Sequence, residues 1–262
     1  MAIKKSTIGI FGFGNMGQAI FRLLKADKNF ANTRFVIYSL GLKKQNGAKC
    51  VSDFSSLCAQ SDLIFPCVKP QDFKKLPAIN IDLKNKIVIS IMAGIKIERI
   101  GKIIHTSKIV RAMPNLALQI GQSMTGWHAD KTYFSRAELA WVKGVMAAFG
   151  KYMYLDNEKK IDAVTAVSGS GPAYVFLFMD ALMEAAMKVG FTEAEARLLV
   201  NQTVKGSLNY AESSDLPTLI KKVSSKKGTT EAALKSLKVN SFYRNWERAV
   251  KKAYERSKEL SK

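Results

Sequence analysis

The first part of the chain alternates short, continuously apolar runs with amphipathic segments. The apolar runs lie at 7–13, 34–39, 62–68, 86–91 and 108–113, with two later ones at 123–127 and 151–155. Because these runs are apolar at successive positions, they predict strands of a parallel sheet that is covered on both faces. The amphipathic segments between several of them predict βαβ units. Ser135 and Glu138 have the spacing of a capping box, which predicts a helix that reaches about Phe149.

After Asp156 the strand signals stop, and the pattern becomes helical. It predicts helices over 158–168, 172–189, 192–211 and 241–259, and a shorter one near 229–238. Pro172 suits a first helical position, Gly190 a helix end, and Thr192 with Glu195 a second capping box. We therefore predict an α/β domain with a parallel sheet over 1–155 and an all-α domain over 156–262.

The predicted helix over 172–189 is apolar on most of its faces. Such a helix is buried, either within its own domain or against a partner. The uninterrupted apolar runs are shorter than the roughly 20 residues that span a bilayer, and the first residues do not have the pattern of a secretory signal. These observations predict a cytoplasmic protein that does not enter a membrane.

Composition narrows the possible chemistry. Of 262 residues 47% are apolar, enough for a large core. The three cysteines form no CxxC pair and the two histidines lie in no ligand cluster, so we expect neither a disulfide framework nor a metal site. The net charge of +20 is spread along the chain without a nucleic-acid-binding motif. It indicates a lysine-rich surface that attracts anionic ligands, and we expect no nucleic-acid partner.

A glycine-rich turn follows the first predicted strand. Its glycines Gly12, Gly14 and Gly17 form GxGxxG where a strand gives way to a helix, with Phe13, Asn15 and Met16 between them. In this context the motif predicts a dinucleotide site, and the alternative is a turn that serves packing only. The second strand ends at Ser39, followed by Lys43 and Lys44, where an NAD site usually has an acid. NADPH is therefore favoured over NADH.

Seven short segments together resemble one family. These segments are GFGNMG (12–17), CVKPQ (67–71), SIMAGI (90–95), AMPN (112–115), VSGSGPAYVF (167–176), QTVKGS (202–207) and VSSKKGTTEAAL (223–234). They resemble, in the same order, Δ1-pyrroline-5-carboxylate reductase, which makes proline. The resemblance implies a Rossmann-type domain followed by a helical dimerisation domain. It further implies reduction of pyrroline-5-carboxylate by NADPH in a homodimer, and leaves open whether dimers assemble further.

The same resemblance implies the roles of individual residues. Four residues are expected beside the nicotinamide half of the cofactor: Val68, Lys69, Pro70 and Ala93. The loop over 223–230 is expected to hold the substrate. There Ser224, Ser225, Gly228 and Thr229 surround the carboxylate, the Thr230 hydroxyl lies near the ring nitrogen as the catalytic group, and Glu212 lies near the pocket.

One segment departs from the family. The family commonly has Pro-Gly-Gly where this chain has Lys226, Lys227 and Gly228. The lost glycine raises the question of how the turn closes. The two lysines either strengthen the local field for a carboxylate or are ordinary surface charges, and the sequence favours neither.

Two other functions compete with imine reduction. A β-hydroxyacid dehydrogenase resembles this chain around Gly169–Gly171 but needs a lysine about four residues later, where this chain has Val175. A non-catalytic NADP(H)-binding sensor would have no need of the 223–230 loop. That loop suits a protonated cyclic imine, which is already electrophilic, because the protein has only to orient the anion and exclude water.

Overall fold

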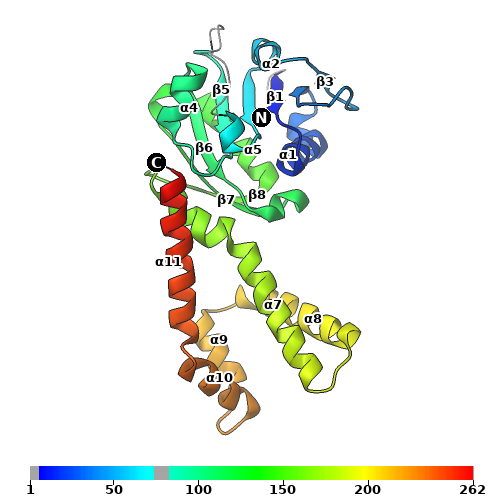
Figure 1. Ribbon diagram of the computed structural model, residues 1–262, viewed down its shortest axis with the longest axis vertical. Helices are drawn as coiled ribbons and strands as arrows, with labels where there is room; N and C mark the ends of the chain where they lie inside the picture. Colours follow the sequence, from blue (N-terminus) through cyan, green and yellow to red (C-terminus); the bar gives the residue numbers. More distant parts are fainter. Residues whose placement is uncertain (1–5, 74–82, 262) are drawn as a thin grey trace. The chain divides into compact units, whose positions relative to one another are not determined.

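A computed structural model describes residues 6–73 and 83–261 (Figure 1). The chain forms two compact units: Met1–Ser170 with Ala253–Lys262, and Gly171–Lys252. Helix α6, Lys160–Val164, packs on strands β6 and β7 and so belongs to the first unit. The boundary between the compact units therefore follows Ser170 and not residue 155. The predicted boundary at 155 between the cofactor-binding and dimerisation functions stays a prediction.

The first unit contains an eight-stranded sheet in the order β3-β2-β1-β4-β5-β6-β7-β8. Its strands are β1 Thr7–Phe11, β2 Arg34–Tyr38, β3 Lys49–Cys50, β4 Leu63–Pro66, β5 Ile87–Ser90, β6 Ile109–Met113, β7 Ser123–Ala129 and β8 Gly150–Tyr154. All seven predicted strands are present, and the two-residue β3 was missed. Strands β1 to β6 pair in parallel, whereas β7 runs antiparallel to β6. The connection over 114–122 is shorter than the dozen or more residues that a parallel crossover needs.

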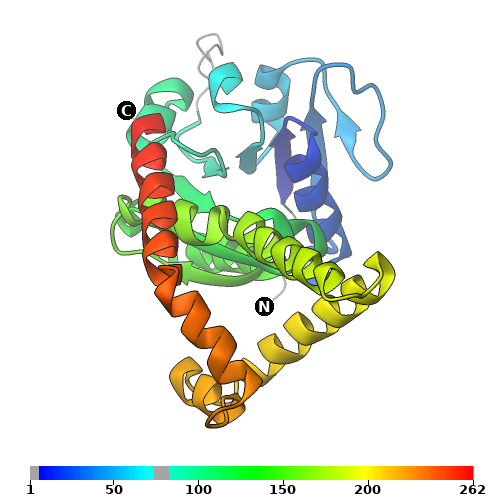
Figure 2. The same ribbon diagram turned by 60° about the horizontal axis from the view of Figure 1, so that its bottom comes forward.

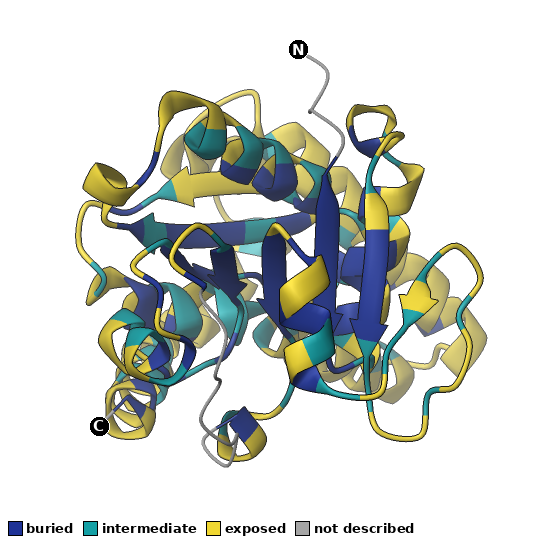
Figure 3. Cartoon of the chain, turned by 90° about the horizontal axis from the view of Figure 1, so that it is seen from above, coloured by how far each residue is buried: buried dark blue, intermediate teal, exposed yellow. Residues whose placement is uncertain are grey.

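Helices cover both faces of this sheet, as the apolar runs predicted. Helices α1 (Asn15–Ala26) and α5 (Arg136–Phe149) contribute to one core, and α2 (Phe54–Gln60) and α4 (Ile97–Ile104) to the other. The short helix α3 is Pro70–Phe73. In Figure 3 the central strands are dark blue because their side chains are buried from both sides.

Both predicted capping boxes are present. The Ser135 hydroxyl accepts a hydrogen bond from the Glu138 amide, and the Glu138 carboxylate accepts one from the Ser135 amide. Thr192 and Glu195 make the reciprocal pair at the start of α8, which is Glu193–Ala211. These caps satisfy amides that the first helical turn leaves without an internal partner.

The rest of the chain is helical, with α7 Gly171–Lys188, α9 Leu216–Val223, α10 Thr229–Val239 and α11 Phe242–Leu260. Helices α7 and α8 form a hairpin (Figure 2). The predicted helix over 158–168 is α6 followed by a π-helical turn, η4 Thr165–Gly169. Helix α9 was missed, although Asp215 caps it and Pro217 lies in its first turn.

Helix α7 is largely exposed in the single chain. None of its residues is buried, and Phe176 and Leu177 are 56% and 68% exposed. Of the two predicted alternatives, burial within its own domain is therefore excluded, and burial against a partner remains. By length and composition alone, the helical stretch Lys160–Lys188 could cross a membrane.

The cap of α2 makes a testable contribution to stability. The Asp53 carboxylate accepts a hydrogen bond from the Ser56 amide at 2.7 Å, and this bond lowers the pKa of Asp53. A carboxyl whose pKa is lowered by folding stabilises the fold above its unfolded pKa of about 3.9. That stability is lost as the pH falls through the folded pKa.

We predict that Asp53→Asn, which keeps an acceptor at the cap, costs stability at pH 6 and costs less at pH 3. Urea unfolding of both proteins at the two pH values measures this difference. An equal cost at both pH values would contradict a role for the ionised carboxylate.

Candidate active site

Four adjacent strands of the first unit end at one edge of the sheet. Strands β2, β1, β4 and β5 are neighbours and run in parallel, so the loops at their carboxyl ends gather there. The chain order reverses between β1 and β4, and such a switch point is where open α/β sheets bind ligands. Every cofactor residue predicted from the sequence follows one of these four strands.

The three glycines after β1 are there for two different structural reasons. Gly12 has φ +91°, and a Cβ there would lie 2.8 Å from the Val68 Cγ1 atom. A Cβ on Gly17 would lie 2.2 Å from the carbonyl oxygen of Gly12. A Cβ on Gly14 would meet nothing within 4 Å, and Gly14 is exposed. Packing explains Gly12 and Gly17, whereas Gly14 leaves open surface for the close approach of a ligand.

The N-terminus of α1 is free to receive an anion. Gly14 is its N-cap residue, no side chain caps the helix, and its first turn contains no acidic residue. The first amides of a helix lack internal partners, and the helix dipole places positive charge there. The turn therefore fits a dinucleotide pyrophosphate.

The end of β2 is tied to this turn. The Phe13 amide donates to the Ser39 hydroxyl at 3.2 Å, and the Gly12 amide donates to the Tyr38 carbonyl at 2.8 Å. The Ser39 hydroxyl accepts in this bond, which leaves its own proton to donate elsewhere. Lys43 and Lys44 are exposed in the segment that follows. A hydroxyl donor and two exposed cations fit a 2′-phosphate.

The loops after β4 and β5 complete this edge. Val68 contacts Gly12, the Lys69 carbonyl accepts hydrogen bonds from the amides of Asp72 and Phe73, and Pro70 begins α3. Ala93 is half-buried in the segment between β5 and α4. Burial raises the pKa of Cys58 to about 12 and also raises the pKa of Cys67, so neither thiol is an ionised nucleophile.

In the second unit, the predicted substrate loop connects α9 to α10. The Gly228 amide donates to the Ser225 carbonyl at 3.0 Å and closes a turn whose third residue, Lys227, has φ +59°. The Glu231 carboxylate accepts from the Lys227 amide at 2.6 Å. A Cβ on Gly228 would lie 2.4 Å from the Ser225 hydroxyl oxygen. Gly228 therefore leaves room for the close approach of the Ser225 hydroxyl.

The start of α10 resembles the start of α1 in its cap, although its first turn contains an acid, Glu231, and that of α1 contains none. Its N-cap residue is Gly228, and no side chain caps it. Thr229 is exposed and Thr230 is half-buried. The uncapped amides at this helix end can donate hydrogen bonds to a carboxylate, as those of the α1 turn can to a phosphate.

A groove of about 540 Å³ in the first unit lies beside α4, away from the edge just described. A larger groove, of about 1010 Å³, lies between α9 and α10 and includes Ser224 and Gly228 in its wall. Four lysines line it: Lys221, Lys227, Lys235 and Lys238. Ser225, Thr229, Thr230 and Glu212 do not line it, and Glu212 is an exposed residue at the end of α8.

Sequence reasoning overlooked a link between two of the motifs. The Asn115 side-chain amide donates to the Ser168 hydroxyl at 3.4 Å, and that hydroxyl donates to the Met124 carbonyl at 3.0 Å. Ser168 belongs to the π-helical turn η4, and such turns are frequent at functional sites. It also overlooked Arg111, whose position inside an apolar strand was the available signal.

Two family models match this chain, one in its first part and one in its last part. Residues 7–94 match the family model described as NADP oxidoreductase coenzyme F420-dependent, and residues 158–260 match Pyrroline-5-carboxylate reductase dimerisation. A Vibrio alginolyticus pyrroline-5-carboxylate reductase is 34% identical over 271 residues, which cover 99% of each protein. The chain belongs to the pyrroline-5-carboxylate reductase family.

Solved structures of pyrroline-5-carboxylate reductases have the same fold. The Plasmodium falciparum pyrroline carboxylate reductase with NADP bound has a TM-score of 0.87 and 29% identity, with all of both chains covered. The Coxiella burnetii pyrroline-5-carboxylate reductase has a TM-score of 0.86 and 32% identity, covering 99% of this chain and 100% of that one. The two-part fold predicted here, with a Rossmann-type domain and a helical dimerisation domain, is confirmed.

The turn geometry accounts for the Pro-Gly-Gly that pyrroline-5-carboxylate reductases commonly have at 226–228. Proline suits the second residue of such a turn and glycine suits a third residue with positive φ. This chain has Lys226 and Lys227 there, and Lys227 adopts the left-handed conformation. A lysine in that conformation is strained by roughly 1–2 kcal/mol.

We predict that Lys227→Gly raises the thermal midpoint of unfolding, because relief of this strain exceeds the roughly 0.5–1 kcal/mol entropic cost of a glycine. Lys226→Gly is the matched control and should lower the midpoint, since Lys226 has an ordinary negative φ and gains nothing. Calorimetry of the three proteins provides the comparison. Equal shifts for the two variants would exclude strain at Lys227.

Proposed function

We propose that this chain reduces Δ1-pyrroline-5-carboxylate to L-proline with NADPH, as a cytoplasmic enzyme and a homodimer. The observation that carries the proposal is the full-length similarity to pyrroline-5-carboxylate reductases, with both glycine-capped helix starts intact. We assign NADP(H) binding to residues 1–155, and dimerisation with substrate binding to 156–262.

In this proposal the cofactor lies along the edge of the sheet formed by β2, β1, β4 and β5. The turn Gly12–Gly17 holds the pyrophosphate, and Ser39 with Lys43 and Lys44 holds the 2′-phosphate. Val68, Lys69, Pro70 and Ala93 surround the nicotinamide. When bound, NADPH supplies a hydride from C4 of its nicotinamide ring. The open space at Gly14 and the uncapped α1 support this placement.

The substrate is held by the loop between α9 and α10. The amides around Ser224, Ser225, Gly228 and Thr229 bind its carboxylate, and the lysines of the α9–α10 groove attract it. The Thr230 hydroxyl donates a hydrogen bond to the ring nitrogen or accepts one from it. A protonated imine needs no further activation by an acid, so orientation and exclusion of water are the tasks of these groups. Glu212, exposed and outside the groove, stays a prediction.

The homodimer is supported by the exposed apolar surface of α7. A second copy of the dimerisation domain would bury Phe176 and Leu177, which are exposed in the single chain. Burial against a partner also accounts for the apolar stretch 160–188 without a membrane. Assembly of dimers into larger rings is left open.

Two alternatives are less well supported. A β-hydroxyacid dehydrogenase would need a lysine where this chain has Val175, an apolar residue that is 47% exposed. A non-catalytic NADP(H)-binding sensor would not need a strained turn, closed on Gly228, in front of an uncapped helix.

The first test concerns the cofactor and the reaction together. We predict that NADPH oxidation depends on pyrroline-5-carboxylate and that kcat/KM is higher with NADPH than with NADH. Ser39→Asp should reverse this preference, because a carboxylate repels the 2′-phosphate and accepts from a ribose hydroxyl. Absorbance at the cofactor's reduced-nicotinamide band measures both rates. Equal kcat/KM for the two cofactors in the unmodified enzyme would exclude the role of Ser39.

The second test concerns Thr230. A hydrogen bond that involves a charged group contributes roughly 1.5–3 kcal/mol, so Thr230→Ala should lower kcat/KM by about 10- to 100-fold. NADPH affinity should hardly change, because the cofactor phosphates lie on the Gly12–Gly17 turn. Thr229→Ala is the matched control and should have a smaller effect, since its amide and not its hydroxyl binds the carboxylate. Unaltered turnover by Thr230→Ala would remove Thr230 from the mechanism.

A further inference from the structure

The segment between β5 and α4 is held at three points. At its start, the buried Ser90 hydroxyl accepts a hydrogen bond from the Met92 amide at 3.3 Å. In its middle, Gly94 has φ +73°, and a Cβ there would lie 2.6 Å from the Leu260 carbonyl oxygen. At its end, the Ile97 amide, the first of α4, donates to a Glu158 carboxylate oxygen at 2.9 Å. This segment contains Ala93.

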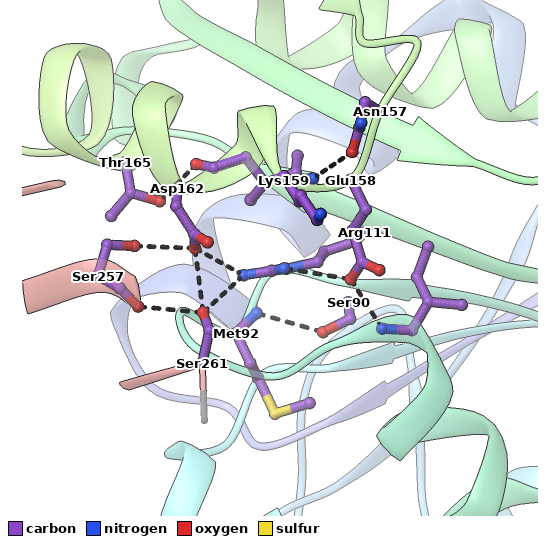
Figure 4. A network of polar contacts seen from close by, with 12 residues as sticks. Ser90, Met92, Arg111, Asn157, Glu158, Lys159, Asp162, Thr165, Ser257 and Ser261 are labelled. Atoms are coloured by element: carbon purple, nitrogen blue, oxygen red, sulfur yellow. Dashed lines mark hydrogen bonds and ion pairs between the residues drawn. The ribbon is translucent and has the colours of Figure 1, made fainter. Parts of the chain in front are cut away.

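A buried cation, the Arg111 guanidinium, shares the Glu158 carboxylate with this segment. Arg111 pairs with Ser90 across the sheet, and its side chain is 2% exposed. Its guanidinium donates to Glu158 Oε1 at 3.1 Å, and to Asp162 Oδ1 at 3.3 Å (Figure 4). A third bond, of 3.4 Å, goes to the Ser261 hydroxyl.

The last turns of α11 take part in the same network. The hydroxyls of Ser257 and Ser261 each donate to Asp162 Oδ1 at 3.0 Å, and both serines are buried. These bonds hold the Leu260 backbone against Gly94, which has no side chain to keep it away. All of these residues belong to the first unit.

We infer that Ser257 and Ser261 are positioning residues for the segment 91–96. They do not touch substrate or cofactor. They fix the end of α11, which supports Gly94, while Arg111 and Glu158 fix the start of α4 on the other side. This inference rests on the proposed function in one respect: Ala93 lies beside the nicotinamide. A displacement of about 1 Å in a reacting group can lower a rate by roughly 100-fold, so rigid support at this segment would matter for hydride transfer.

The test uses serine variants because Arg111 is unsuitable. Removal of Arg111 would leave the buried Asp162 carboxylate without a cation and would endanger the fold. In the double variant Ser257→Ala/Ser261→Ala, the ion pairs of Arg111 remain. The hydroxyl bonds to Asp162 are lost, together with the bonds of the Ser261 hydroxyl to Arg111 and to the Ser257 carbonyl. The matched control is Ser55→Ala/Ser107→Ala, which changes two exposed serines of the same unit. Ser257→Thr/Ser261→Thr keeps both hydroxyls and should restore the behaviour of the unmodified enzyme.

Two measurements on the full-length protein are expected to change together. Amide hydrogen exchange in peptides that cover 90–97 should become faster in the double variant, without any ligand present. Turnover, kcat, should fall by roughly 10-fold while KM for pyrroline-5-carboxylate is retained. Binding of 2′,5′-ADP, which reports on the adenosine half alone, should stay within about twofold.

The outcomes distinguish failure of this inference from failure of the proposed function. Unchanged exchange at 90–97 would overturn the inference, and so would a loss of kcat that the control variant shares. Faster exchange throughout the chain with weaker 2′,5′-ADP binding would also overturn it, since that pattern indicates general destabilisation. If the unmodified enzyme does not reduce the imine, the proposed function fails, and the exchange measurement still decides whether the serines position the segment.

Discussion

The buried charge of Arg111 is the constraint on which the organisation of the first unit depends. A cation in a nearly water-free site is costly unless carboxylates and hydroxyls surround it. Its partners come from two separate segments: Glu158 and Asp162 at the start of α6, and Ser261 after α11. The hydrogen bonds of the Arg111 guanidinium therefore hold the start of α6 and the end of α11 in place. Helix α11 has its first residues in the second compact unit and its last in the first.

Two kinds of helix N-terminus stand out among the described residues. Side chains cap α2, α5, α8 and α9 through Asp53, Ser135, Thr192 and Asp215. Helices α1 and α10 instead begin after Gly14 and Gly228, and no side chain caps them. A side-chain cap would occupy the amides that an anionic ligand needs. The two glycine-capped helices are those proposed to hold the cofactor phosphates and the substrate carboxylate, so in this proposal one physical device serves both ligands.

The sequence predicted the sheet and most helices because their signals are local. Continuous apolar runs identify buried strands, and the capping boxes at Ser135 and Thr192 mark helix starts wherever the chain folds. Short or irregular elements were missed for the opposite reason. The two residues of β3 and the eight residues of α9 are too few to show a clear periodic pattern. The π-helical turn after Val164 has the same composition as an ordinary helix. The direction of β7 depends on the length of its connection to β6 and not on its own residues.

The sequence alone determined the family, the dinucleotide motif and the order of the two folding regions, because each of these is written in contiguous residues. Tertiary structure decided what depends on distance. It showed that Gly14 faces open space while Gly12 and Gly17 are needed for packing. It also placed Lys227 in the left-handed conformation and left α7 without cover in the single chain. The contact of Gly94 with Leu260 joins residues 166 positions apart, and the Arg111–Ser261 bond joins residues 150 positions apart. No local pattern records such contacts, because only folding brings the two ends together.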